Sequence, residues 1–464
     1  MWGITLEPNS AVSLARQIFL GFQERIITGQ LQAGEALPST RALCKELGVS
    51  RNTVCEAYDM LLTEGFLISR QGAPTRVAQG LTIRRVEQKN LPAQATPDHP
   101  PVAWDFRTGQ PDLSLFPWQQ WSHALRSAAD TLSVQELGYR SPKGYAPLCA
   151  ELADWLLRRR GMAVDPADVF ITAGATQALH LLVDLLRRDG CAFAIETPSH
   201  PGIHTMLLDK GYPIHPMPVD GQGADSSSLE GTTISAAYVT PSHQFPLGGI
   251  LPASRRAELL RLAKEGGFLI MEDDYDSEFR YAGAPVSPIY CMDPSHVAYV
   301  GTFSKTLFPA LRLGFVVLPK AFHNQFLHLR TYLDVQSPIL EQAALAEFLR
   351  TRKMDRHVQH MRRVYGERRD VLLRSIERAF GSSARCWGDA SGLHVALQVA
   401  GMEFGEAFIT ASRKAGIRVN PLWKYCGLAY GHRDKLLLGY AHLTPDQIEP
   451  GVAALRRVIK ECVT

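Results

Sequence analysis

Short apolar segments alternate with helical segments from residue 104 onward, and this alternation limits the fold more than any other feature of the chain. The apolar segments lie at 169–172, 191–196, 234–240, 268–271, 296–300 and 313–318. Amphipathic stretches such as 175–188 and 254–264 separate some of them. Strands that are apolar on both faces and joined by helical crossovers predict an α/β fold with a largely parallel sheet covered on both sides.

Polar clusters occur where three of these segments end or begin, and ligands of such sheets bind at the carboxyl ends of the strands. Residues 172–177, TAGATQ, combine small side chains with the start of a helix, whose N-terminus favours an anion. Residues 271–276, MEDDYD, place carboxylates after an apolar strand, where each needs a partner such as a cation or a metal ion. No histidine pattern accompanies this acidic run. Residues 301–315 contain Lys305 among small and hydroxyl-bearing side chains, followed by Arg312.

The three clusters together meet the chemical requirements of pyridoxal 5′-phosphate. A lysine forms an imine with the aldehyde, an acidic group stabilises a protonated ring nitrogen, and an arginine with a helix N-terminus binds the phosphate. Each cluster alone has a simpler explanation, namely a surface lysine, a solvated acidic loop or an arginine in an ion pair. Their order and spacing favour one shared site, so we predict this cofactor at Lys305.

A different pattern occupies residues 1–80. Three helices and two short strands are predicted at 12–28, 39–47, 51–64, 66–69 and 75–77. A short helix, a glycine turn and a longer helix have the spacing of a helix-turn-helix, and the strands would form its wing. Seven basic and seven acidic residues in this segment balance its charge. Pattern alone therefore leaves a DNA-binding module and a small helical packing module equally open.

A resemblance favours DNA binding. Residues 37–77 read LPSTRALCKELGVSRNTVCEAYDMLLTEGFLISRQGAPTRV and resemble the winged helix of GntR-family bacterial regulators, within a similarity that covers nearly all of residues 10–78. The resemblance implies double-stranded promoter DNA as a partner. Cys55 lies where some members have another basic residue. The positions that match the family's DNA contacts are Arg41, Ser50, Arg51, Asn52, Thr53, Gln71, Gly72 and Thr75.

Length and composition predict several domains in a reducing compartment. A chain of 464 residues exceeds the usual single domain. Residues 81–104 are polar and proline-bearing, which predicts a linker between residues 1–80 and 105–464. The eight cysteines show no CxxC or metal-ligand spacing, so we expect free thiols and no metal site. Neither a membrane helix nor a secretory signal is recognisable, so we expect a cytoplasmic protein without membrane contact.

From about residue 106 the chain resembles fold-type I aminotransferases, which have a large domain with a mostly parallel sheet and a smaller C-terminal α+β domain. The resemblance makes Lys305 the Schiff-base lysine, Asp273 the partner of the pyridine nitrogen and Tyr275 the partner of the ring hydroxyl. His200 stands where the family usually stacks a tyrosine on the ring, and Tyr139 matches a tyrosine that reaches the partner subunit's phosphate. The residues that would surround the phosphate are Ala175, Thr176, Thr302, Ser304 and Arg312.

One position departs from the aminotransferase pattern. These enzymes commonly hold the substrate α-carboxylate with an arginine shortly before the final helix, and Leu437 takes that position here. An apolar side chain cannot form the bidentate carboxylate pair. Arg418 and Arg433 are the nearby candidates to replace it. In this C-terminal part, from about residue 337, the pattern predicts helices and strands at 341–349, 357–379, 393–398 and 416–420.

The combination of both halves resembles MocR-type transcriptional regulators, and residues 240–256, TPSHQFPLGGILPASRR, and 272–281, EDDYDSEFRY, match that group's motifs. The resemblance implies a regulator that senses pyridoxal phosphate or an amine through an internal aldimine at Lys305. It also implies a head-to-tail homodimer. The alternative is an active aminotransferase with an accessory DNA-binding module. Leu437 argues against steady turnover of ordinary amino acids, while a residual half-reaction stays open.

Overall fold

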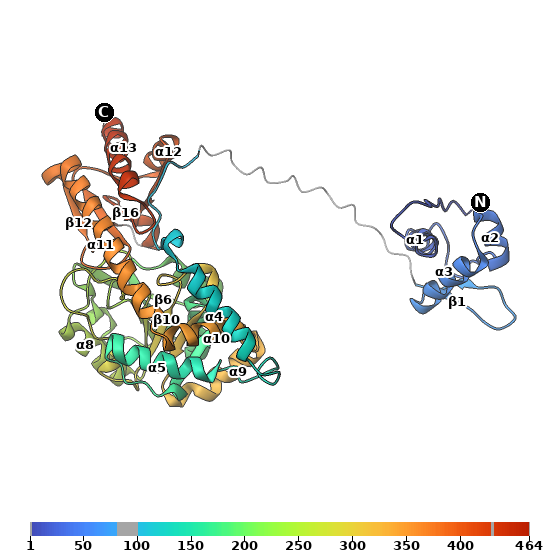
Figure 1. Cartoon of the computed structure of the whole chain (residues 1–464), viewed down its shortest axis with the longest axis horizontal. Helices are drawn as coiled ribbons and strands as arrows, with labels where there is room; N and C mark the ends of the chain where they lie inside the picture. The colour runs from blue at the N-terminus through green and yellow to red at the C-terminus, as the bar shows by residue number, and fades with distance from the viewer. Residues whose placement is uncertain (1, 81–100, 428–430, 464) are drawn as a thin grey trace. The chain divides into compact units, whose positions relative to one another are not determined.

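The computed structural model describes residues 2–80, 101–427 and 431–463. The chain divides into two compact units, residues 1–97 and 98–464, both drawn in Figure 1. Residues 81–100, most of the predicted linker, lie outside the described residues.

The N-terminal unit is a winged helix, as predicted. Its elements are α1 (Leu14–Ile27), α2 (Thr40–Leu47), α3 (Arg51–Thr63), β1 (Leu67–Ile68) and β2 (Arg76–Val77). The two strands pair antiparallel to form the wing. Phe22, Val54 and Leu61 lie in one buried core with residues of all five elements. The apolar residues that recur at four-residue spacing in the first helix, such as Phe22, contribute the face of α1 that enters this core.

Local signals set the ends of the helices in this unit. The Ser39 hydroxyl accepts a 3.2 Å hydrogen bond from the Ala42 amide and caps α2. The Ser50 hydroxyl accepts a 3.1 Å bond from the Thr53 amide and caps α3. Gly48 ends α2 with φ 67°, a left-handed conformation that glycine adopts readily. The turn between the two helices is therefore encoded within a few residues.

An eight-stranded sheet forms the centre of the second unit. Its strands, in spatial order, are β4 (Val169–Thr172), β11 (Gly314–Val317), β10 (Val297–Thr302), β9 (Leu269–Asp274), β8 (Ile234–Val239), β5 (Ala192–Thr197), β6 (Ile214–Asp220) and β7 (Gly223–Ala224). The strands from β10 to β6 pair in parallel, which confirms the predicted sheet type. β11 runs antiparallel to both of its neighbours, β10 and β4. The chain therefore reverses direction between β10 and β11 without a helical crossover.

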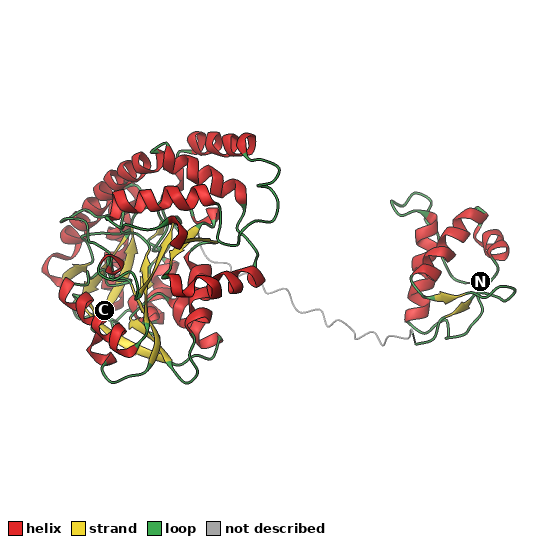
Figure 2. Ribbon diagram, turned by 90° about the horizontal axis from the view of Figure 1, so that it is seen from below, coloured by secondary structure: helices red, strands yellow, loops and turns green. Residues whose placement is uncertain are grey.

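Helices cover both faces of this sheet, as Figure 2 shows. One face packs against α4 (Trp118–Thr131), α5 (Ala146–Arg160), α8 (Ala253–Gly266) and α10 (Ile339–Arg350). The other packs against α6 (Ala175–Leu186), α7 (Pro201–Asp209) and α9 (His323–Leu333). Within β4, Val169 and Ile171 enter the first core while Phe170 enters the second. This division explains why the strands are apolar at nearly every position.

The C-terminal part has its own antiparallel sheet and core. The sheet consists of β12 (Ala384–Trp387), β13 (His394–Val399), β16 (Lys435–Gly439) and β15 (Asn420–Pro421), packed with α11 (Lys353–Phe380), α12 (Glu406–Lys414) and α13 (Pro445–Val463). The prediction of one strand at 416–420 is wrong. β14 (Ile417–Arg418) instead pairs with β3 (Trp104–Asp105), and only β15 joins the sheet. The partner strand comes from the distant start of the unit, which no local pattern indicates.

Short 3-10 turns complete the described structure. They lie at Leu113–Leu115, Pro166–Asp168, Ser226–Leu229, Ile289–Cys291, Pro309–Leu311, Lys320–Phe322, Gly381–Ser383 and Leu422–Tyr425. All eight cysteines are free thiols. Across the described ranges, every helix is too short or too polar to cross a membrane.

Candidate functional site

A cavity of about 300 Å³ lies at the carboxyl ends of β8, β9 and β10, beside the N-terminus of α6. It collects every predicted cofactor residue except Tyr139. The residues brought together are Ala175, Thr176, His200, Asp273, Tyr275, Thr302, Ser304, Lys305 and Arg312. Segments more than a hundred positions apart thus meet at the end of the sheet where such folds bind ligands.

Lys305 lies in the segment that joins β10 to β11. Its Nζ donates a 2.8 Å hydrogen bond to the carbonyl of Gly109. Burial lowers the pKa of Lys305, although Asp276 and Asp273 act in the opposite direction. A lowered pKa increases the fraction of neutral amine, which is the form that attacks a carbonyl carbon. The residue therefore has the environment of a reactive lysine.

Asp273 has one oxygen bound and one oxygen free. Its Oδ2 accepts a 2.8 Å hydrogen bond from the Tyr238 hydroxyl. Its Oδ1 is buried and has no hydrogen-bond partner within the described part of the chain. Burial raises the pKa of Asp273 to about 6. A buried carboxylate oxygen without a donor is unfavourable, so the site fits a ligand that brings an N–H, such as a protonated pyridine nitrogen.

The opposite end of the cavity suits a phosphate. Gly174, with φ 83°, begins α6 and directs its first turn, Ala175 and Thr176, at the cavity. Arg312 donates a 2.6 Å bond to the Ala173 carbonyl, which places its guanidinium beside that turn. Since β11 runs antiparallel to β10, Arg312 returns to the cavity close to Thr302. A helix N-terminus and an arginine together provide the donors that a phosphate needs.

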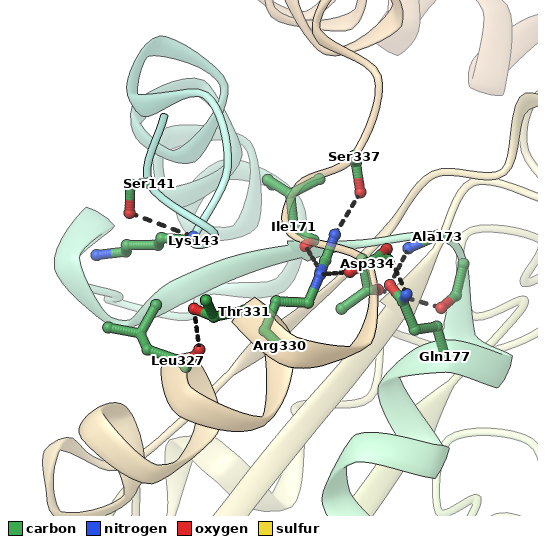
Figure 3. A network of polar contacts seen from close by, with 12 residues as sticks. Ser141, Lys143, Ile171, Ala173, Gln177, Leu327, Arg330, Thr331, Asp334 and Ser337 are labelled. Carbon is green, nitrogen blue, oxygen red and sulfur yellow. Dashed lines mark hydrogen bonds and ion pairs between the residues drawn. The ribbon is translucent and has the colours of Figure 1, made fainter. Parts of the chain in front are cut away.

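A hydrogen-bond network supports this turn, as Figure 3 shows. The Gln177 side-chain oxygen accepts a 2.7 Å bond from the Ala173 amide, and its nitrogen donates a 2.7 Å bond to Asp334. Asp334 is paired with Arg330, which is 1% exposed and also donates to the Ile171 carbonyl. Gln177 was part of the TAGATQ cluster, but the sequence did not indicate that it anchors the turn to α9.

The acidic run begins inside β9, which continues to Asp274 beyond the predicted strand at 268–271, and its residues have separate roles. Both Glu272 oxygens accept 2.9 Å bonds, one from the Ile289 amide and one from the Tyr290 amide. Asp274 forms a buried 2.7 Å ion pair with Arg160. The structure, where it is described, holds no group of three or more His, Cys, Asp or Glu that could bind a metal ion. Glu272 and Asp274 therefore support the strand, while Asp273 serves the cavity.

His200 and Tyr139 occupy different environments. His200 caps α7, and its Nδ1 accepts a 3.0 Å bond from the Gly202 amide. Burial lowers the pKa of His200, and its ring lies 5.6 Å from the ring of Phe245. Tyr139 is 90% exposed and does not line the cavity of its own subunit. Its predicted contact with a partner subunit stays a prediction.

Two cavity neighbours that the sequence interpretation did not assign are His243 and Asp276. The Tyr275 hydroxyl lies 2.9 Å from His243 Nδ1, and the same nitrogen lies 3.1 Å from both oxygens of Asp276. His394 also lines the cavity, and burial lowers its pKa to about 3. The sequence signals were the family-matching motifs that contain His243 and Asp276 and, for Asp276, the acidic run 271–276, and none of them gave a role to either side chain.

Leu437 is 0% exposed in β16 and packs in an apolar cluster with Phe245 and Leu422. Neither proposed substitute reaches the cavity. Arg418 donates a 3.2 Å bond to Asp105, and Arg433 lies over the ring of Trp423. The side chain at the position that the resemblance gives to the carboxylate-binding arginine is therefore buried and apolar.

The predicted DNA-contacting residues lie on α2, the start of α3 and the wing. Arg41, Arg51 and Asn52 are exposed, as are Gln71 and Gly72. The Ser50 hydroxyl caps α3 and lies 2.8 Å from the Thr53 hydroxyl, while the Thr75 carbonyl accepts a 2.9 Å bond from the Leu37 amide. Arg51 and Asn52 are thus the side chains of the α3 N-terminus that remain available for base edges.

Comparisons with known proteins identify both halves. A family model described as aminotransferase class I and II matches residues 105–455. A model for bacterial regulatory proteins of the gntR family matches residues 14–77.

Curated relatives share the whole layout. The probable rhizopine catabolism regulatory protein MocR of Rhizobium meliloti is 31% identical over 98% of this chain and 95% of its own length. The HTH-type transcriptional regulator TauR of Rhodobacter capsulatus is 30% identical over 98% of both chains. The HTH-type pyridoxine biosynthesis transcriptional regulator PdxR of Corynebacterium glutamicum is 30% identical over 91% of both chains.

Solved aminotransferases share the fold of the second unit. LysN, the α-aminoadipate aminotransferase of Thermus thermophilus, complexed with N-(5′-phosphopyridoxyl)-L-leucine, has a TM-score of 0.71 at 27% identity and covers 78% of this chain and 92% of that chain. The kynurenine aminotransferase of Pyrococcus horikoshii has a TM-score of 0.72 at 24% identity, covering 79% of this chain and 92% of its own. The chain therefore belongs to the MocR-type transcriptional regulators, in which a gntR-family winged helix binds DNA and an aminotransferase-like domain takes pyridoxal 5′-phosphate.

Proposed function

We propose that this regulator senses pyridoxal 5′-phosphate, or a primary amine without an α-carboxylate, at Lys305, and that occupancy of the cavity changes its binding to promoter DNA. The observation that carries the proposal is the convergence of Lys305, Asp273 and Arg312 on one cavity. When bound, the cofactor supplies an aldehyde that exchanges amines and a ring that withdraws electrons.

Each side chain has a defined task in this proposal. Lys305 would hold the cofactor through its Nζ, since a neutral lysine amine is the group that reacts with an aldehyde. The Asp273 oxygen without a partner accepts the ring N–H. Arg312 and the first turn of α6 bind the phosphate, while Thr302 and Ser304, whose hydroxyls lie 3.1 Å apart, offer two more donors at the same end.

The apolar position of Leu437 supports a ligand without an α-carboxylate. The only lysine and arginine among the described cavity side chains are Lys305 and Arg312, both assigned to the cofactor. Burial lowers the pKa of His200 and of His394, so both are neutral near pH 7. Leu437 is buried and lies outside the cavity lining, so position 437 offers no charged group to the cavity, and a carboxylate bound there would lose its hydration without gaining a charged partner. The same argument disfavours the alternative, an aminotransferase acting on ordinary amino acids.

A homodimer completes the proposed site. Tyr139, Val134 and Leu137 are exposed on the segment after α4. The Arg140 amide in that segment donates a 2.8 Å bond to Gln336, next to the exposed Tyr332 and Leu333 at the end of α9. Exposed apolar surface of this kind is typical of an interface. We assign it to a second copy in a head-to-tail arrangement, with Tyr139 reaching the partner's phosphate.

Promoter DNA is the second partner, and we place the regulator with it in the cytoplasm. The proposed DNA contacts are Arg41, Ser50, Arg51, Asn52, Thr53, Gln71, Gly72 and Thr75. The eight free thiols fit a reducing compartment.

Absorbance of the purified full-length protein tests the proposal. Wild-type protein with added pyridoxal phosphate should show a visible band, and Lys305→Ala should not. Lys143→Ala, a lysine outside the cavity, is the matched control and should keep the band. Absence of the band in wild type contradicts the cofactor assignment at Lys305.

A second titration tests the ligand class. α-Amino acids and amines of the same length without a carboxylate are added to the loaded protein, and absorbance and promoter affinity are recorded together. The carboxylate-free amines should change both signals more strongly. Leu437→Arg should reverse this order, whereas Leu437→Met should keep it. An unchanged preference in Leu437→Arg would mean that position 437 does not select the ligand.

A further inference from the structure

Tyr275, His243 and Asp276 form a buried hydrogen-bonded chain beside the cavity. Tyr275 and Asp276 line the cavity, and His243 lies behind them on the segment after β8. His243 Nδ1 is 2.9 Å from the Tyr275 hydroxyl and 3.1 Å from each Asp276 oxygen. The side chains of His243 and Asp276 are each 1% exposed. The contact between His243 and Asp276 is therefore shielded from water.

The positions of the hydrogens in this chain follow from what each group can do. A carboxylate only accepts hydrogen bonds, so the nitrogen that faces both Asp276 oxygens must carry a hydrogen. The other ring nitrogen of His243, Nε2, is buried without a hydrogen-bond partner among the described residues. An unpartnered lone pair is tolerated there better than an unpartnered N–H. His243 is therefore protonated at Nδ1.

This tautomer decides the direction of the Tyr275 hydroxyl. Because Nδ1 already carries a hydrogen, the Tyr275 oxygen can accept from it but cannot donate to it. Burial, followed by the charge of Asp276, raises the pKa of Tyr275 far above its usual range, so the hydroxyl keeps its hydrogen. The remaining direction for that hydrogen is the cavity.

We propose that Asp276 and His243 are positioning residues that turn the Tyr275 O–H toward a ring oxygen of the bound cofactor. The inference rests on the proposed cofactor site and adds two residues that act on it through the Tyr275 hydroxyl. The chain has the order carboxylate, imidazole, hydroxyl, so the carboxylate selects the imidazole tautomer.

Packing holds the imidazole in one orientation. A Cβ at Gly392 would lie 2.1 Å from His243 Cε1 and 2.6 Å from Asp276 Oδ2. The Gly392 carbonyl is held in place by hydroxyls of Tyr281 and Tyr440, at 2.8 and 2.7 Å. On another side the His394 ring lies 5.3 Å from the His243 ring. His394 is bound through Nε2 to the Pro246 carbonyl at 3.1 Å, so it does not compete for Nδ1.

The arrangement has a measurable consequence. A hydrogen bond donated to the cofactor's ring oxygen withdraws electron density and makes the lysine-linked nitrogen less basic. The pKa of that nitrogen is read from absorbance as a function of pH. Loss of the hydrogen bond from the Tyr275 hydroxyl should raise this pKa. Loss of the Asp276 charge alone should lower it, because a nearby anion favours the protonated form.

A double-mutant cycle separates these opposite effects. Tyr275→Phe, Asp276→Asn and the double variant are titrated as cofactor-loaded proteins. In the wild-type background Tyr275→Phe should raise the spectroscopic pKa by about one unit, the equivalent of one hydrogen bond. In the Asp276→Asn background the same step should have less than half that effect. The asparagine amide donates to His243 Nδ1, which favours the tautomer with its hydrogen on Nε2, as in serine proteases. The Tyr275 hydroxyl then donates to Nδ1 and no longer toward the cavity. If Tyr275→Phe changes the spectroscopic pKa equally in the wild-type and Asp276→Asn backgrounds, the proposal is overturned.

Tyr238→Phe provides the matched control, since it removes another cavity hydroxyl, one that donates to Asp273 and not to the chain. The change that Tyr238→Phe causes in the spectroscopic pKa should be the same with and without Asp276→Asn.

A measurement on wild-type protein does not depend on the variants loading cofactor. Nitrogen NMR of ¹⁵N-histidine-labelled protein, with His243 assigned by comparison with His243→Gln, reports the tautomer directly. Hydrogen on Nδ1 supports the inference, and hydrogen on Nε2 overturns it. Failure of wild type to develop the visible band would contradict the proposed function, not the tautomer.

Discussion

Lys305 Nζ and the Gly109 carbonyl are joined by a 2.8 Å hydrogen bond across 196 positions of sequence. Gly109 has φ 73°, and a Cβ there would lie 2.9 Å from the lysine nitrogen. The segment that enters the second unit therefore forms one wall around the reactive lysine, and glycine is needed for that close approach.

Gly109→Ala should weaken the binding of pyridoxal phosphate, because the added methyl group displaces Lys305 Nζ. Crowding of this kind costs about 1–3 kcal/mol, so the dissociation constant should rise by roughly 5- to 150-fold. Absorbance titration of the full-length protein measures the change. Gly161→Ala is the control, since Gly161 has φ 68° but open space around its Cβ position. Equal losses in both variants would attribute the effect to backbone strain alone.

Gln177→Ala should loosen the phosphate end of the cavity, because Ala173 and Asp334 both lose their bond to this side chain. Each lost hydrogen bond corresponds to about 1 kcal/mol. Affinity for pyridoxal phosphate should fall, while affinity for pyridoxal, which lacks the phosphate, should change little. Gln325→Ala on the exposed side of α9 should leave both unchanged. A parallel fall for both ligands would place the effect elsewhere than the phosphate.

Arg51→Ala should weaken promoter binding by about 1–3 kcal/mol, because Arg51 is exposed at the N-terminus of α3 and can reach a base edge. Fluorescence anisotropy with the promoter region of its own or a neighbouring gene measures the loss. Arg456→Ala changes the charge equally on an exposed helix of the second unit. If both variants bind DNA as wild type does, α3 is not the reading helix.

Glu196→Gln should flatten the pH dependence of stability. Burial raises the pKa of Glu196 to about 7 from 4.5, so between these values the folded protein holds more protons than the unfolded chain. Stability contributed by this group is therefore present at low pH and falls as pH rises through that window. Urea unfolding of the cofactor-free protein at about pH 5 and pH 8 should show a smaller fall in the variant.

Glu230→Gln is the control for this measurement, because Glu230 is exposed. A fall in stability between the two pH values that is as large in Glu196→Gln as in wild type would show that Glu196 does not titrate in this range.

Several parts of the fold were predictable because their causes are local. Ser39, Gly48 and Ser50 fix the helix-turn-helix through hydrogen bonds and backbone conformations within a few residues. Strands apolar at nearly every position, such as β4 and β8, indicated burial on both faces. The antiparallel direction of β11 and the division of residues 416–420 between two sheets depend on partner strands elsewhere in the chain.

The sequence by itself determined that Lys305, Asp273 and Arg312 stand at strand ends, and hence that they could share a cofactor. Only the tertiary structure decided what surrounds them: the Gly109 carbonyl on Lys305, and His243 between Tyr275 and Asp276. The physical reason is that side chains at strand ends are placed by the period of the strand, whereas their hydrogen-bond partners arrive from loops of distant segments. Those partners are selected by shape and burial in the folded chain, which no local pattern records.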